Sequence, residues 1–176
     1  QFASRHPRLD YIDQSMDLLG QALEYAPNRI DIYYALAQGY FLQDDIDKAE
    51  EALYQALDLD VRQFNTYSNL VEIQMRRGAI PEAMTNLRHA GEFGNMNFSD
   101  LETFAKILVQ REAWEAVIEV LVNMQQLQPN DVNIYSNIAL AYSQTGEKDQ
   151  AIEWINKILE IDPSYQEQVQ QFIDSL

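Results

Sequence analysis

The stretch AYSQTGEKDQAIEWINKILEIDP, residues 141–163, contains the pattern that decides the fold. It reads as the end of one helix, a turn at Gly146 and a complete second helix that stops before Pro163, because glycine favours helix ends and proline cannot continue a helix. A similar stretch, AQGYFLQDDIDKAEEALYQALDLDV, occupies residues 37–61. The likeness of the two stretches predicts an internal repeat.

Aligning the chain with itself so that Tyr33 falls on Tyr67 brings four units into register. Apolar residues recur at helical spacing in two bursts per unit, separated by a turn, so each unit is predicted to be a pair of antiparallel helices. One such pair cannot bury its own apolar face, and stacking of neighbouring units is required. The clearest columns are Tyr33, Tyr67, Leu101 and Tyr135; Leu36, Leu70, Phe104 and Ile138; Ala37, Val71, Ala105 and Ala139; and Leu53, Leu87, Leu121 and Ile155.

This unit resembles the tetratricopeptide repeat and has the same length as that repeat. The segment AYSQTG at 141–146, Ala151-Ile152 and Asp162-Pro163 are close to the family pattern, whereas tyrosine or leucine replaces the tryptophan of the family's first helix. The resemblance implies an all-α fold, a right-handed α-solenoid of about ten antiparallel helices, in which the first helix of each repeat lines a concave face.

The register predicts a single domain over residues 1–176. A lone helix at 9–27 aligns with the second helix of a repeat, and its missing partner suggests that the chain is cut from something longer. Ser164 and Glu167 are expected to form a capping box for a terminal helix that shields the last repeat. The predicted parts are 9–27 (half-repeat), 30–63, 64–97, 98–131 and 132–163 (repeats) and 164–176 (capping helix).

The segment GEFGNMNFS, residues 91–99, is expected to be irregular. Its two glycines are expected to end one helix early, and Ser99 with Glu102 to open the next helix. The turn before Trp114 is expected to be one residue shorter than in the other repeats. The sequence leaves open whether Ala116 or Val117 occupies the column of small residues.

The composition disfavours several kinds of partner. Twelve Lys and Arg residues stand against 28 Asp and Glu residues, a net charge of −16. Such a chain repels the phosphates of nucleic acid and the head groups of anionic lipid. There is no cysteine. No apolar run approaches the roughly 18 residues that a membrane span needs. We therefore expect no nucleic-acid partner and no membrane insertion of this segment.

The sequence offers little catalytic chemistry. His6 and His89 have no second ligand near them in the repeat register. The acidic run Asp44–Asp47 lacks the alternating oxygen ligands of a calcium loop and fits a helix N-terminus better. There is no glycine-rich phosphate loop and no nucleophile or zinc motif. We predict no catalytic residue, no metal and no cofactor.

What remains is the surface of the first helices. Asn65 and Asn69 recur as Asn133 and Asn137, and an asparagine amide can both donate to and accept from a peptide backbone. Similar inward asparagines hold extended peptides in some family members; alternatively, these residues are solvated or bridge neighbouring helices. Apolar residues near the N-terminal half form a possible floor, unless the rest of the parent protein covers them. The candidate partner-binding residues are Tyr34, Gln38, Phe41, Asn65, Asn69, Glu72, Met75, Lys106, Asn133 and Asn137.

These observations predict a non-catalytic scaffold that binds a protein or peptide segment. Short strings, among them APNR at 26–29 and VQQFIDSL at 169–176, also resemble the repeat tails of bacterial O-antigen ligase-like membrane proteins. That resemblance implies the alternative of a soluble appendage of an enzyme of cell-surface polysaccharide assembly. Self-association through the half-repeat is a third possibility. The sequence does not indicate a compartment.

Overall fold

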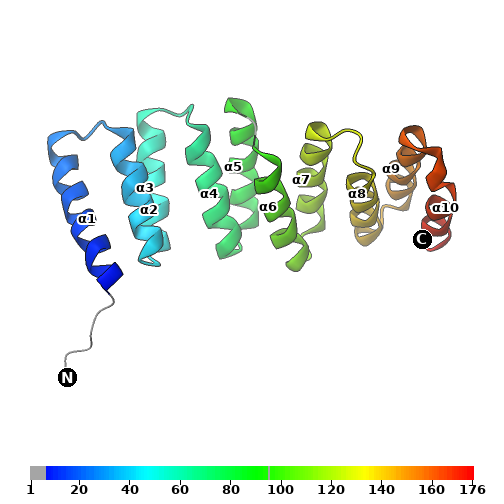
Figure 1. Ribbon diagram of the computed structural model, residues 1–176, viewed down its shortest axis with the longest axis horizontal. Coiled ribbons are helices and arrows are strands. Elements are labelled where there is room, and N and C mark those ends of the chain that lie inside the picture. Colours follow the sequence, from blue (N-terminus) through cyan, green and yellow to red (C-terminus); the bar gives the residue numbers. More distant parts are fainter. Residues whose placement is uncertain (1–6, 95) are drawn as a thin grey trace, which may run out of the picture. The chain divides into compact units, whose positions relative to one another are not determined.

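The computed structural model describes residues 7–94 and 96–176 and is all-α over that part of the chain (Figure 1). Ten α-helices and one 3-10 helix are present there, with no β-strand. The elements are α1 (Pro7–Tyr25), α2 (Ile30–Leu42), α3 (Ile46–Leu59), α4 (Phe64–Arg77), α5 (Ile80–Phe93), α6 (Phe98–Gln110), α7 (Trp114–Leu127), α8 (Val132–Thr145), α9 (Lys148–Ile161), η1 (Pro163–Tyr165) and α10 (Gln166–Asp174).

The helices follow the repeat register. The four first helices begin at Ile30, Phe64, Phe98 and Val132, as predicted. The four second helices begin at Ile46, Ile80, Trp114 and Lys148, with the same constant spacing. The predicted shortening of the turn before Trp114 was therefore wrong. Val117, which is buried, takes the position of the small residues, and Ala116 is only half-buried.

The prediction that the glycines near residue 91 end a helix early was also wrong. α5 has 14 residues, the same length as α3, α7 and α9. Gly91 lies within α5 on an exposed face, where its missing side chain costs only helix propensity. Gly94 is the first residue after the helix and has an extended backbone.

The turn inside each of the four repeats has the same backbone conformation. Gly78 and Gly146 end their first helices in the left-handed conformation, with φ of 78° and 82°, and the predicted turn at Gly146 is confirmed. Asp44 and Glu112 hold the same place in the other two repeats, with φ of 62° and 54°. In every case the next residue donates its N–H to a carbonyl at the end of the first helix. These bonds are Asp45 to Tyr40 (2.9 Å), Ala79 to Gln74 (2.9 Å), Ala113 to Leu108 (3.1 Å) and Glu147 to Tyr142 (3.0 Å).

Where a side chain caps a helix in the described part of the chain, it is an aspartate or an asparagine rather than a serine. Asp45 caps α3 by accepting from the Lys48 N–H, which confirms the capping role of the acidic run. The two predicted serine caps were wrong. Asn97 accepts from the Asp100 N–H at 2.9 Å, which places Ser99 inside the first turn of α6. Asp162 accepts from the Ser164 N–H at 2.9 Å and opens η1, so that α10 begins only at Gln166.

Two compact units divide the chain, unit 1 with α1 to α5 and unit 2 with α6 to α10. In each unit the helices pair within a repeat and stack on the next repeat. The core of unit 1 centres on Leu36, Ala49 and Leu53, and Met16, Leu19 and Leu23 of α1 pack against it. In unit 2, Val169 brings α10 onto a core with Tyr135 and Ile155. The single domain over residues 1–176 stays a prediction.

Candidate functional site

Unit 1 contains a hollow between its two first helices, α2 and α4, with α3 beneath them. Its volume is about 360 Å³. Leu53 of α3 lies at the base of the hollow but is itself buried, with 1% of its surface exposed, and Ala37 of α2 is buried as well. The lining residues are Ala37, Gln38, Phe41, Leu42, Leu53, Asn69, Glu72 and Ile73.

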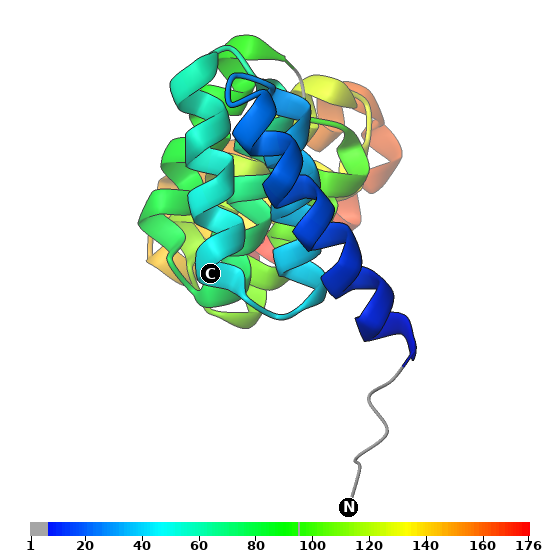
Figure 2. The same cartoon turned by 90° about the vertical axis from the view of Figure 1, so that its left-hand side faces the viewer.

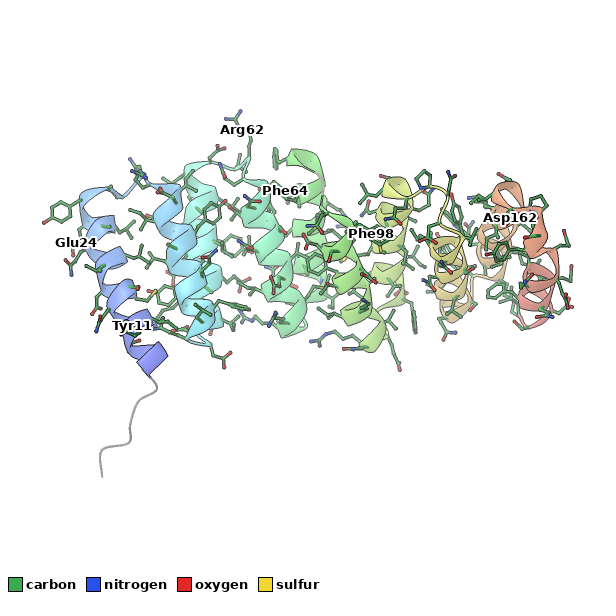
Figure 3. All side chains as sticks on the ribbon, viewed as in Figure 1. Tyr11, Glu24, Arg62, Phe64, Phe98 and Asp162 are labelled. Carbon is green, nitrogen blue, oxygen red and sulfur yellow. The ribbon has the colours of Figure 1, made fainter. Side chains whose placement is uncertain are left out.

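Unit 2 contains a hollow of the same construction, between α6 and α8 with α7 beneath. Its volume is about 580 Å³. Phe98 at the start of α6, which Figure 3 labels, contributes to its wall. Further lining residues are Glu102, Ala105, Lys106, Val109, Gln110, Trp114, Val117, Leu121, Met124, Asp131, Asn133, Ile134, Asn137, Leu140 and Ala141.

The two hollows use the same positions of the repeat. Every residue that lines the hollow of unit 1 has a counterpart exactly two repeats later that lines the hollow of unit 2. The eight pairs are Ala37/Ala105, Gln38/Lys106, Phe41/Val109, Leu42/Gln110, Leu53/Leu121, Asn69/Asn137, Glu72/Leu140 and Ile73/Ala141. The fold thus produces the same concave site once in each unit.

Of the four predicted asparagines, Asn69 and Asn137 stand in equivalent places of the two hollows. Asn133 also lines the hollow of unit 2, but its Nδ2 donates to Asp131 Oδ1 at 2.9 Å, which occupies one of its donor hydrogens. Asn65 is exposed on α4 and is not among the described residues that line a hollow.

Two predicted groove residues lie elsewhere. Met75 is completely buried, so its prediction as an exposed contact was wrong. The reason is that α4 is covered on more than one side: seven of its residues are buried, including the consecutive run from Ile73 to Met75. Tyr34 is half-buried, and its hydroxyl hydrogen-bonds to Thr66 and donates to Gln63 Oε1 at 3.3 Å. Tyr34 therefore ties α2 to the next repeat.

Of the remaining predicted residues, Glu72 and Lys106 are charged, and each forms an ion pair within its own helix. In unit 1, Glu72 pairs with Arg76 at 2.7 Å, and the Arg76 guanidinium lies over the Phe41 ring at 4.9 Å. In unit 2, Lys106 pairs with Glu102 at 3.0 Å. Both ion pairs join exposed side chains on one helix, where such pairs contribute little stability and can rearrange for a ligand. Gln38 is exposed at the edge of the unit 1 hollow.

The sequence reasoning missed the contribution of the second helices. Leu53 and Leu121 were predicted as core, and Trp114 and Met124 were not considered for the site. Leu53 and Leu121 are 1% and 5% exposed, so they belong to the core, as predicted, and also form the base of the hollows.

Two further observations on residues 7–94 and 96–176 bear on other functions. No group of three or more His, Cys, Asp or Glu residues in this part of the chain is arranged to hold a metal ion. His6 lies outside the described residues. No helix in the described ranges has the length and apolar composition needed to cross a bilayer.

Comparison with known proteins gives two matches to family models described as tetratricopeptide repeat, at residues 30–60 and 132–165. Subunit 3 of the anaphase-promoting complex of Dictyostelium discoideum is 29% identical over 79 residues, which is 42% of this chain and 8% of that protein. The chain therefore matches less than a tenth of the length of this curated relative.

Several solved structures share the fold. A crystal structure of the MamA protein superposes with a TM-score of 0.63 and 19% identity, over 90% of this chain and 86% of that one. YrrB, described as a TPR protein with an unusual peptide-binding site, gives 0.61 and 15%, over 96% and 86%. The complex of Naa15/Naa10 bound to HypK-THB gives 0.67 and 15%, over 85% of this chain and 23% of that one. Identities this low establish the fold alone.

None of the relatives named above is an O-antigen ligase-like protein, and that resemblance stays a prediction. The repeat does not depend on it. The constant register, the four helix pairs and the two matches to family models agree with one another. Residues 30–60 and 132–165 are tetratricopeptide repeats.

Proposed function

We propose that this chain is a protein-interaction scaffold that holds extended segments of partner proteins in its two hollows. The observation that carries the proposal is the repetition of the hollow, with Asn69 in one copy and Asn137 in the other. An amide at this place can accept from a backbone N–H and donate to a backbone carbonyl, whatever side chains the peptide carries. In this proposal the chain binds and positions its partners and performs no catalysis.

The floor of each hollow would supply most of the affinity. In unit 1, Phe41 and Leu42 offer apolar surface beside Asn69, and the buried Leu53 lies at the base of the hollow. Burying one large apolar side chain of a partner there is worth about 1.5–3 kcal/mol, and each hydrogen bond to an asparagine adds about 0.5–1.5 kcal/mol. Ordering the peptide and losing its translational freedom offset much of this gain. We therefore expect micromolar affinity for a short peptide.

The two hollows differ at their charged and polar positions, which predicts different preferences. Gln38 and Glu72 in unit 1 are replaced by Lys106 and Leu140 in unit 2. The hollow of unit 2 is therefore better suited to a partner segment that combines an apolar residue with an acidic one. The hollow of unit 1 is better suited to a segment whose polar group can form a hydrogen bond with Glu72 or Gln38.

The similar proteins support a binding role of this kind. YrrB is described as having an unusual peptide-binding site, and Naa15/Naa10 was solved bound to HypK-THB. Net charge adds a further restriction. With a charge of −16, the chain as a whole disfavours nucleic acid, whereas a single acidic residue of a partner can still pair locally with Lys106.

The test is selection from a library of unstructured peptides, followed by affinity measurement with Asn69→Ala and Asn137→Ala. We expect each substitution to weaken its own class of selected peptides about five- to tenfold while the Tm changes little. Asn156→Ala is the matched control, because Asn156 is exposed on α9 and does not line either hollow. Peptides whose affinity depends on neither asparagine would contradict the proposal.

A further inference from the structure

We propose that the hollow of unit 1 binds its partner segment through a basic side chain, arginine or lysine, whose position Arg76 occupies while no partner is bound. The inference rests on the proposed function, since it names the chemistry that one of the two hollows recognises. The position lies between the Glu72 carboxylate on α4 and the Phe41 ring on α2, which we call the cation site. In Figure 2, α1 (blue) lies in front of α2, and α1 does not line this hollow.

The cation site is built from two successive first helices. Glu72 and Phe41 both line the hollow, whereas Arg76 does not. Arg76 still reaches both of them: its Nη2 lies 2.7 Å from Glu72 Oε1, and its guanidinium carbon lies 4.9 Å from the centre of the Phe41 ring. A carboxylate and the face of an aromatic ring each attract a cation. The hollow therefore offers a site for one positive charge, and the chain fills that site with its own arginine.

The internal ion pair can be exchanged for one with a partner. The Arg76 side chain is 57% exposed and the Glu72 side chain 45%. A pair between such exposed side chains contributes little stability, because water solvates both charges nearly as well as they solvate each other. Asn69 lies one turn before Glu72 on α4 and also lines the hollow. A basic segment that pairs with Asn69 and Glu72 together therefore adds contacts beyond the one it replaces.

The alternative is that an acidic residue of a partner pairs with Arg76. Two observations favour the basic partner. The face of the Phe41 ring is negative, so it attracts a cation and repels a carboxylate. Asp and Glu residues also outnumber Lys and Arg residues in unit 1, so an acidic segment would approach the hollow against the field of the surrounding charges.

The hollow of unit 2 has a different composition at the same positions. Val109 and Leu140 replace Phe41 and Glu72, and Gln144 replaces Arg76. The ring, the carboxylate and the internal cation are thus exchanged together, as expected of three groups that act as one site. Peptides that depend on Asn137 should therefore need no basic residue at this position.

Arg77, the neighbour of Arg76, provides a matched control. Its guanidinium pairs with Asp47 at 3.0 Å and with Glu50 at 2.5 Å, and both carboxylates belong to α3. Neither of them lines the hollow. Replacing Arg76 or Arg77 by glutamine removes the same charge from the same helix, but only the first replacement removes it from the cation site.

The probes are synthetic peptides from the library whose affinity depends on Asn69. Each is made a second time with citrulline in place of arginine, or norleucine in place of lysine, which keeps the approximate length without the charge. We expect these peptides to contain a basic residue, and the neutral copies to bind about tenfold more weakly. Raising the salt concentration from about 50 to about 500 mM should weaken the basic peptides and leave the neutral copies nearly unchanged.

Three variants of the chain then test the cation site by the direction of their effects. Glu72→Gln should weaken the basic peptides about five- to tenfold and leave the neutral copies unchanged. Arg76→Gln should strengthen the basic peptides about two- to fivefold, because it removes the internal competitor. Arg77→Gln should change their affinity less than about twofold. Fluorescence anisotropy measures the affinities, and circular dichroism confirms that each variant is folded.

The outcomes separate this inference from the proposed function. Peptides that depend on Asn69 but bind equally well as neutral copies would overturn the cation site and leave the scaffold proposal intact. A loss of affinity in Arg76→Gln would also overturn it, because Arg76 would then itself contact the peptide. Equal gains in Arg76→Gln and Arg77→Gln would overturn it too, since only net charge would matter. Peptides that depend on neither Asn69 nor Asn137 would contradict both proposals.

Discussion

Glu112 and Gly146, one repeat apart, hold the same left-handed backbone conformation, with φ of 54° and 82°. Glycine adopts this conformation freely, whereas a residue with a side chain loses roughly 1–2 kcal/mol in it. The bond that closes the turn is kept in both repeats, from the Ala113 N–H to Leu108 and from the Glu147 N–H to Tyr142. The repeat geometry therefore imposes this conformation even where the sequence supplies no glycine.

The first prediction is that Glu112→Gly stabilises the chain. Relief of the backbone strain is partly offset by the greater entropy of glycine in the unfolded state, which leaves a gain of about 0.5–1 kcal/mol. Asp44→Gly should give a smaller gain, because aspartate tolerates the left-handed region better than glutamate does. Urea denaturation measures both free energies of unfolding.

Two alanine substitutions serve as controls. Gly146→Ala should lose about 1 kcal/mol, although an added Cβ there meets no atom within 4 Å, so the loss would come from the backbone alone. Gly91→Ala, which also has open space but lies inside α5, should gain about 0.5–1 kcal/mol. If Gly146→Ala proved neutral, the explanation by backbone strain would fail.

The second prediction concerns a buried polar network in unit 1. Gln74 is buried on α4, and its Nε2 donates to Glu50 Oε1 at 2.8 Å and to the Tyr54 hydroxyl at 3.2 Å. Its Oε1 accepts from Asn86 Nδ2 at 2.8 Å. One repeat later the positions of Gln74 and Asn86 hold Leu108 and Val120, both buried. An apolar pair thus fits the same places in the fold.

Gln74→Leu should destabilise the chain by about 2–3 kcal/mol, because it leaves the buried Asn86 amide without this acceptor. Adding Asn86→Val should recover at least about 1 kcal/mol of that loss, since no orphaned amide remains. A double-mutant cycle by chemical denaturation gives the coupling energy. Additive losses in the double variant would show that the two amides do not act as a unit.

Repetition explains why the helix positions were predictable and some side-chain roles were not. Four copies of one pattern determined the starts of the first helices at Ile30, Phe64, Phe98 and Val132. A cap is decided by a single residue, and at α6 both Asn97 and Ser99 can accept a hydrogen bond, so the sequence did not distinguish them. Met75 was misplaced because register places a residue on a helix face but does not say how many neighbours cover that face.

The residues that the first helices contribute to the site were predictable, but those that the second helices contribute were not. Asn69 and Asn137 were found from their recurrence two repeats apart. The floor of the hollows was not, because Leu53 and Leu121 lie on second helices and read as ordinary core. The link from Tyr34 to Thr66 joins residues 32 positions apart, and no local pattern reports such a contact.

The third prediction separates structure from binding at Tyr34. Tyr34→Phe removes the hydroxyl that Thr66 and Gln63 share, and Thr66 is completely buried. We expect a loss of about 1–2 kcal/mol in the free energy of unfolding, because the buried Thr66 hydroxyl loses this partner. Affinity for peptides that bind in the hollow of unit 1 should change less than twofold. A large loss of affinity with unchanged stability would instead indicate that Tyr34 contacts the bound peptide.

The fourth prediction is a dependence on pH at the cap of α3. The side-chain hydrogen bond from Lys48, at 2.6 Å, and then the Lys48 backbone N–H hold the pKa of Asp45 below its ordinary value. Because the folded state binds this proton less readily than the unfolded state, the contribution of Asp45 is complete above an ordinary carboxyl pKa of about 4. It is lost as the pH falls through the lowered pKa of the folded state. The pKa values of Asp60 and Asp162 are lowered in the same direction, chiefly by the backbone N–H groups of Arg62 and Ser164.

Asp45→Asn tests this contribution, since an asparagine keeps a capping oxygen but has no charge to pair with Lys48. At pH 7 the variant should have a lower Tm than the parent chain. Between pH 5 and pH 2.5 the parent should lose more Tm than the variant, so that the two curves converge. The comparison cancels the effect of all other carboxylates, which titrate alike in both proteins. Parallel curves across this range would show that the pairing of Asp45 with Lys48 contributes nothing to stability.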